Sequence, residues 1–184
     1  MPWYAGNYYT SQYQREQNAL MVWSFFEQYG WTKNAVAAML GNMEVESSIN
    51  PGIWEGLNDD PEAYYEEHGR YPGYGLVQWT PYTKYADWAG ELWKNNGGMQ
   101  CARIQYEMEV GIQFAWPTMT FRQFSRSRKD PRKLAEIFEL GYERHAGDPQ
   151  PIRKTHAWKW FHFLGGAYFP LELIDTKRRS KPYV

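Results

Sequence analysis

The sequence predicts one helix-rich domain of the α+β class, in which a small β element interrupts a predominantly α-helical chain. Apolar residues recur at intervals of three and four along most of the 184 residues, which is the spacing of helices with one buried face. The segment 73–79 (GYGLVQW) is too short and too rich in glycine for a helix, so we expect a small strand or hairpin there. The single cysteine excludes an intramolecular disulfide.

Cap and turn residues set the limits of the expected helices. Thr32 is a candidate N-cap, Thr80-Pro81 and Asp130-Pro131 each combine a cap with a first-turn proline, and Asn50-Pro51-Gly52 is a strong turn signal. The polar and acidic residues 53–73 are expected to form a long surface loop. The apolar spacing predicts helices within residues 16–29, 33–49, 81–93, 101–115, 131–141 and 151–164.

The chain is expected to divide into a central domain and two terminal arms. We predict an N-terminal arm over residues 1–15, the helical domain over residues 16–165 and a C-terminal arm over residues 166–184. The amino terminus has no basic region followed by an apolar run, so we expect no secretory signal. No stretch approaches the roughly 18 apolar residues that a membrane span requires.

Composition narrows the classes of partner and chemistry. The 20 basic and 21 acidic residues give a net charge of −1, which lacks the basic footprint of a nucleic-acid-binding protein. The spacing of His145, His156 and His162 does not place two ligands on one helix face, so we expect no metal and no cofactor. Cys101 lies on an apolar helical stripe, which indicates a buried thiol. The 10 Trp, 15 Tyr and 9 Phe residues suit either sugar rings or a core, and composition alone favours the core.

Two acids lie in the segment 41–51 (GNMEVESSINP), and helix geometry separates them. At about 100° per residue, Glu46 lies about 20° from Met39 on the helical wheel, whereas Glu44 lies about 140° away. We therefore expect Glu46 to be partly buried at the end of a core helix, and Glu44 to face outward or sideways. Burial raises the pKa of a carboxyl group, and a protonated glutamic acid can donate its proton to a leaving oxygen. The alternative role for Glu46 is structural, as a cap or as the partner of a buried arginine.

The order of the motifs adds a family resemblance. A helix that ends in Glu46-Ser47, followed by the segment 75–78 (GLVQ), resembles the lysozyme superfamily. The full set is similar to the phage tail lysozyme family, represented by the lysozyme-like domain of the tail-tip peptidoglycan-degrading protein of small podoviruses that infect Gram-positive bacteria. The motifs that carry this resemblance are 30–33 (GWTK), 39–43 (MLGNM), 46–47 (ES), 50–54 (NPGIW), 75–81 (GLVQWTP), 119–121 (MTF), 135–138 (AEIF) and 142–144 (YER).

The resemblance implies a lysozyme-like fold with a small β-hairpin and a site for cleaving peptidoglycan. Glu46 would be the catalytic acid, which protonates the glycosidic oxygen of the β-1,4 bond between N-acetylmuramic acid and N-acetylglucosamine. Tyr74, Gln78 and Trp79 would line the sugar cleft, and Tyr142 would lie near the cleavage site. The alternative is that the fold itself satisfies Gln78 and Trp79, and that Tyr142 belongs to a helix core.

The second catalytic carboxylate stays open, and so does the reaction type. Glu44, Glu55, Asp59 and Asp60 are candidates that the sequence cannot rank, and a single acid would also suit a lytic transglycosylase. The resemblance favours a hydrolase of the phage tail that opens the host cell wall for genome entry, with peptidoglycan as substrate and other tail proteins as partners, contacted through the terminal arms. An inactive wall-binding tail module and a cell-encoded wall hydrolase are the alternatives.

Overall fold

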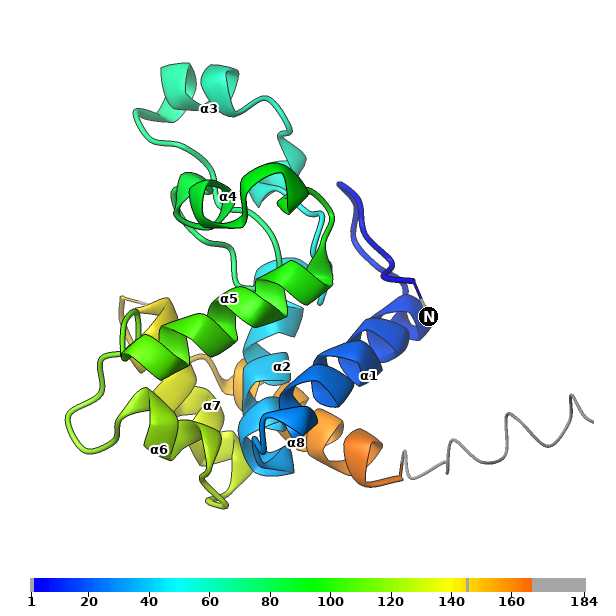
Figure 1. The fold of residues 1–184 in the computed structure, drawn as a ribbon, viewed down its shortest axis with the longest axis vertical. Helices are drawn as coiled ribbons and strands as arrows, with labels where there is room; N and C mark the ends of the chain where they lie inside the picture. Colours follow the sequence, from blue (N-terminus) through cyan, green and yellow to red (C-terminus); the bar gives the residue numbers. More distant parts are fainter. Residues whose placement is uncertain (1, 145, 167–184) are drawn as a thin grey trace, which may run out of the picture.

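The structure, a computed structural model, describes residues 2–144 and 146–166 (Figure 1). This part of the chain is built almost entirely of helices. Two 3₁₀ turns, Glu55–Leu57 (η1) and Gly90–Leu92 (η2), and a π-helical turn, Glu139–Glu143 (η3), supplement the α-helices. The α-helices are α1 (Gln12–Gln28), α2 (Lys33–Ser47), α3 (Pro61–His68), α4 (Thr83–Ala89), α5 (Gly97–Val110), α6 (Phe121–Ser125), α7 (Pro131–Phe138) and α8 (Pro151–Gly166).

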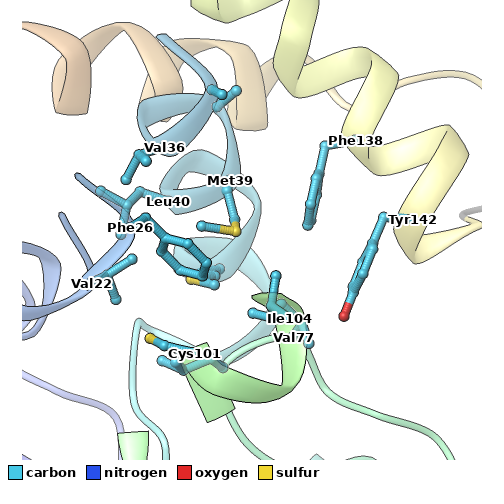
Figure 2. Close-up of a cluster of buried hydrophobic side chains, with 14 of the residues drawn as sticks. Val22, Phe26, Val36, Met39, Leu40, Val77, Cys101, Ile104, Phe138 and Tyr142 are labelled. Carbon is cyan, nitrogen blue, oxygen red and sulfur yellow. The ribbon is translucent and has the colours of Figure 1, made fainter. Parts of the chain in front are cut away.

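Helix α2 is the centre of the core and is enclosed on all sides. Every residue from Ala35 to Glu44 is buried, although the sequence of α2 shows only one strongly apolar stripe. Side chains of α1, α5 and α7 surround Met39 in the close-up of the core (Figure 2). The thiol of Cys101 lies in this cluster, which confirms the expectation that it is buried. Because α2 is enclosed, its C-terminal end is held rigidly in the middle of the domain.

The packing of α2 against α8 depends on a glycine. A Cβ atom on Gly41 would lie 2.6 Å from the backbone nitrogen of Ala157 and 2.6 Å from the carbonyl oxygen of Arg153. Both atoms belong to the backbone of α8, which cannot move aside as a flexible side chain can. Gly41 therefore allows the two helix backbones to approach closely, and this approach brings Arg153 to the end of α2.

The expected outward position of Glu44 is wrong. Its side chain is only 4% exposed and accepts hydrogen bonds from Arg15 of α1 (3.0 Å) and from Lys159 (2.7 Å) and Trp160 (2.8 Å) of α8. The helical wheel assumed a helix with one buried face, whereas α2 buries every face from Ala35 to Glu44. Glu44 thus ties α1, α2 and α8 together as a structural ion-pair centre.

Several predicted helix starts are confirmed. Thr32 caps α2 by accepting a hydrogen bond from the Ala35 N–H, and Asp130 caps α7 by accepting one from the Arg132 N–H. Helix α8 begins at Pro151, where the sequence places it.

Two predicted helices are shorter than expected. The helix expected from Pro81 begins at Thr83 and gives way to the 3₁₀ turn at Gly90. Helix α5, expected over residues 101–115, ends at Val110, because Gly111 adopts a left-handed conformation (φ +74°). Ile112 therefore lies outside it.

The predicted β-hairpin at residues 73–79 is not present. Within the described residues this segment forms only isolated bridges, between Trp54 and Tyr74 and between Tyr74 and Trp79. Positive φ angles at Gly75 (+79°) and Gln78 (+49°) curl the backbone into successive turns, so it cannot extend into paired strands. The described fold is therefore predominantly helical, and its β content reduces to these bridges.

Residues 53–73 are a partly helical segment, whereas the sequence predicted a loop. Helix α3 begins after Asp60, whose side chain caps it by accepting hydrogen bonds from the N–H groups of Glu62 and Ala63. In Figure 1, α3 lies at the far end of the molecule from α6, α7 and α8. Only Tyr64 of α3 is buried, so this helix adds little to the core.

The segment expected as an N-terminal arm lies against the domain. Asn7 donates a hydrogen bond to the Leu57 carbonyl (2.8 Å) and accepts one from the Trp54 N–H (3.1 Å). The Asn50 side chain donates to the carbonyl oxygens of Gly6 (2.8 Å) and Tyr8 (2.6 Å). Residues 2–11 thus form part of the wall around residues 50–57.

The C-terminal arm predicted over residues 166–184 lies outside the described residues, apart from Gly166. Among the helices of the described part, none combines the length and the apolar character needed to cross a bilayer.

The close approach of α2 and α8 predicts that a larger residue at position 41 destabilises the protein. Gly41→Ala should lower the free energy of unfolding by about 1–3 kcal/mol, because the new methyl group must push the α8 backbone away. Thermal and urea unfolding would measure this loss. Gly98→Ala in α5 is the matched control, since its Cβ would meet nothing closer than 3.5 Å, and it should leave stability unchanged or slightly higher. Equal effects of the two changes would contradict the packing argument.

Candidate active site

A cleft of about 410 Å³ opens beside the C-terminal end of α2. Segments far apart in the sequence build its walls: the N-terminal segment, the end of α2, residues 53–56 and the turn after Gln78. The residues that line it are Tyr9, Glu46, Ile53, Trp54, Glu55, Gly56, Arg70, Gln78, Thr80 and Glu143. Four of these side chains are charged, so the cleft is suited to a polar substrate.

Glu46 lies in this cleft, in the last turn of α2. Its side chain is 22% exposed, which agrees with the expected partial burial. Ser48, two residues further on, adopts a left-handed conformation (φ 56°) and ends the helix. The chain turns away at this point, and the turn leaves the Glu46 carboxyl group accessible at the edge of the core.

Arg153 of α8 fixes the direction of the Glu46 side chain. Its Nη2 atom donates a hydrogen bond to Oε1 of Glu46 at 2.6 Å, and its Nη1 atom donates to Oδ1 of Asn42 at 3.1 Å. Its Nε atom lies 3.3 Å from Oε1 of Glu139, and the Arg153 side chain is only 4% exposed. Glu46 is therefore both a cleft residue and the partner of a buried arginine, the structural position that the sequence offered as one alternative.

A second cavity of about 270 Å³ adjoins the first. Gln78, Thr80 and Glu143 line both cavities, so the two form one groove that runs past the end of α2. Tyr142 and Trp79 contribute to the lining of the second cavity. The groove thus continues from Glu46 toward the π-helical turn.

Gln78 lines both cavities of this groove, and the nitrogen of its side-chain amide makes hydrogen bonds within the fold. Its Nε2 atom donates to the carbonyl oxygens of Ile53 (3.2 Å) and Gly75 (3.0 Å). These bonds lock the side chain across the turn and direct the amide group. The Oε1 atom is left as the acceptor that the groove can offer to a sugar hydroxyl or N–H group.

The other three predicted sugar-binding residues are largely buried. Tyr74 is 1% exposed, hydrogen-bonds with Asn95 and lines neither cavity. Trp79 is 3% exposed, stacks on Tyr85 and donates a hydrogen bond to Glu107. Tyr142 is 1% exposed.

Tyr142 is held in the core beside the second cavity. Its ring stacks on Phe138 with centroids 4.6 Å apart, and the two rings lie side by side in Figure 2. Its hydroxyl group donates to Glu107 of α5. Burial and the neighbouring carboxylate raise the pKa of Tyr142 well above its ordinary value, so its hydroxyl stays protonated as a donor. Because Trp79 and Tyr142 are buried, their rings form the inner wall of the second cavity. A ring that stacks on a sugar would need an exposed face.

The four candidates for a second carboxylate occupy very different places. Glu44 is the buried ion-pair centre described above, and Asp59 and Asp60 are exposed and line neither cavity. Glu55 alone lies in the cleft, where Arg70 donates two hydrogen bonds to it, at 2.6 and 2.8 Å. This contact and the Gly73 N–H hydrogen bond lower the pKa of Glu55 to about 2, so it is a firmly ionised carboxylate.

Sequence reasoning did not single out Tyr9, Arg70 and Glu143, which line the groove, or Arg153, which holds Glu46. Tyr9 was assigned to the N-terminal arm. Glu143 was quoted only as part of the family motif at residues 142–144. The motif itself was the available signal, since it places an acid directly after Tyr142. Within the described ranges, no group of three or more His, Cys, Asp and Glu side chains is arranged to hold a metal ion.

The fold and groove belong to a recognisable class of protein: the chain is a member of the phage tail lysozyme family, whose sequence profile matches residues 17–164. The chain is also 39% identical, over 183 residues, to "Morphogenesis protein 1" of Bacillus phage B103. That match covers 94% of this chain and 48% of the relative, so the chain spans about half the length of this curated protein. The resemblance predicted from the ordered motifs is thereby confirmed.

The Glu55–Arg70 contact predicts a defined dependence of stability on pH. The folded-state pKa of Glu55 is about 2 and its ordinary value is 4.5, so its stabilising effect is present above pH 4.5 and is lost as the pH falls toward 2. The difference in urea midpoint between the wild type and Glu55→Gln should therefore shrink across this range. A difference that stays constant from pH 5 to pH 2 would contradict this assignment of the pKa.

Proposed function

We propose that this chain is a peptidoglycan-cleaving glycosidase of a phage tail. It would cleave the β-1,4 bond between N-acetylmuramic acid and N-acetylglucosamine, with Glu46 as the general acid that protonates the glycosidic oxygen. The observation that carries this proposal is the position of Glu46, at the rigid end of a buried helix and within an open groove. A proton donor needs both a fixed direction and access to the substrate, and this position supplies both.

The groove supports binding of a glycan. Gln78 offers its amide oxygen between the two cavities, and Tyr142 and Trp79 back the second cavity. We propose that these residues position the sugar rings, and that Tyr74 acts from the core by fixing the turn that holds Gln78. The charged lining is consistent with recognition of sugar hydroxyl and N-acetyl groups by hydrogen bonds.

The family and the phage relative support a setting in the virion. We propose that the chain is carried in the phage tail and opens the host cell wall locally for genome entry. Contacts with other tail proteins would then involve surfaces away from the groove. The C-terminal arm, which the sequence suggests for this role, lies outside the described residues.

Digestion of purified Gram-positive peptidoglycan, followed by mass spectrometry of the released fragments, tests the proposed function. The wild type should release muropeptides with reducing ends, and Glu46→Gln should lower the rate at least about 100-fold, because glutamine cannot donate the proton. Products with anhydro-muramic ends would change the reaction to transglycosylation. Release of no fragments by the wild type would contradict an enzyme and favour a wall-binding tail module.

Glu44→Gln is the matched control, two residues away on the same helix. It should lower the free energy of unfolding by about 1–3 kcal/mol, because it weakens hydrogen bonds to Arg15 and Lys159. The folded fraction should keep most of its activity, since Glu44 does not line the groove. Equal loss of activity in the two variants would contradict the assignment of the acid to Glu46.

A further inference from the structure

Glu143 is a second carboxyl group at the centre of the groove. It is the last residue of the π-helical turn η3, and it lines both the 410 Å³ cleft and the 270 Å³ cavity beside it. Glu46 lines the first of these cavities. Three carboxyl groups from distant parts of the sequence therefore face the same space, and the third, Glu55, is paired with Arg70.

One carboxyl oxygen of Glu143 lacks a hydrogen bond within the described part of the chain. Its Oε1 atom is shielded from solvent and has no hydrogen-bond partner among the described residues. Three buried acids differ in this respect: Glu44 contacts Arg15 and Lys159, Glu107 contacts Arg103 and Tyr142, and Glu139 contacts Arg153. An unpartnered buried oxygen costs stability, so its presence calls for a reason other than folding.

The backbone around Glu143 is fixed, so its position in the groove is not accidental. Tyr142 is anchored in the core, and its carbonyl oxygen accepts a hydrogen bond from Gln113 (3.0 Å). The Gly141 carbonyl accepts one from the Ala115 N–H (2.8 Å), and Arg144 ends the turn in a left-handed conformation. A π-helical turn inserts one extra residue into a helix, and such turns are common at functional sites.

The charges around Glu143 favour a bound proton. Burial is the main cause that raises its pKa well above the ordinary value, and the negative charge of Glu46 raises it further. Arg153 acts in the opposite direction, but its guanidinium group contacts Glu46 and Glu139. The charged groups that act on Glu143 are Glu46 of α2, Arg153 of α8, Glu107 of α5 and Glu139 of η3.

Resting on the proposed glycosidase function, we propose that Glu143 is the second catalytic carboxyl group and that it and Glu46 carry one proton between them. Two carboxylates that face one partly buried space do not both ionise readily, and one proton between them removes the repulsion. Arg153 donates a hydrogen bond to Glu46.

The shared proton gives a balanced reaction. The carboxyl pair (Glu46 and Glu143) passes its proton through Glu46 to the glycosidic oxygen as the bond between that oxygen and the anomeric carbon breaks. The oxygen of a water molecule bonds to the anomeric carbon, and a proton of this water returns to the pair through Glu143. The pair begins and ends the cycle with one proton, and the net change is addition of water across the bond.

Glu143→Gln tests the proposal, because glutamine matches the shape of a protonated glutamic acid and cannot transfer a proton. The rate at saturating peptidoglycan (kcat) should fall at least about 100-fold, with little change in KM or Tm. Glu143→Asp should recover part of the rate. A purely structural role for Glu143 would leave kcat of Glu143→Gln near the wild-type value, and that result would overturn the proposal.

Two controls separate this proposal from the function on which it rests. Glu136→Gln changes a half-buried acid of α7 that pairs with Lys133 and Lys154 and lines neither cavity, and it should keep full activity. The double variant Glu46→Gln, Glu143→Gln should be no slower than either single variant, since the pair acts as a unit. A wild type that cuts, with Glu46→Gln inactive and Glu143→Gln active, would overturn only the role of Glu143.

A titration supplies a readout that does not depend on turnover. In ¹³C NMR spectra with labelled glutamate side chains, the Glu143 carboxyl should titrate well above its ordinary pKa in the wild type. Glu46→Gln should lower this pKa, because it removes a neighbouring negative charge and frees the Arg153 guanidinium. An unchanged Glu143 pKa in this variant would show that the two groups are not coupled and would overturn the proposal.

Discussion

The buried guanidinium of Arg153 is the interaction on which the site depends. It joins α8 to Asn42 and Glu46 of α2 and to Glu139 of the π-helical turn. A buried cation is tolerated only where its charge and its donors are satisfied, and loss of one partner of a buried pair typically costs about 3–5 kcal/mol. This one side chain therefore fixes the spatial relation between the end of α2 and the turn that carries Glu143, which are the two carboxyl-bearing edges of the groove.

The enclosure of α2 makes this arrangement rigid. The close approach at Gly41 and the ion-pair centre at Glu44 both hold α2 against α8, and Glu44 also joins α2 to α1. The groove is then completed by segments with little regular structure: residues 2–11, residues 53–57 and the turn at Gln78. The end of α2 is thus held on a packed helix and faced by loops that hydrogen bonds hold in place, which is the kind of support that a preorganised site requires.

The aromatic residues show how one composition supports two interpretations. Sugar binding and core packing both explain a high content of Trp and Tyr, and Tyr74, Trp79 and Tyr142 turn out to be buried. Their polar atoms contact Asn95 and Glu107, as buried Tyr and Trp groups usually require. The groove instead presents charged and amide groups, namely Glu46, Glu55, Arg70, Gln78 and Glu143.

The sequence by itself determined most helix positions, several of their caps and the placement of Glu46 at the end of a core helix. These features depend on residues close together in the chain, so local spacing is enough to predict them. It could not decide that Glu44 is buried, that residues 73–79 form turns, or that Glu143 faces the same groove as Glu46. Each of these depends on neighbours that are distant in the sequence. A helical wheel identifies one buried face, whereas the tertiary structure surrounds α2 with other helices and so requires a partner for every face.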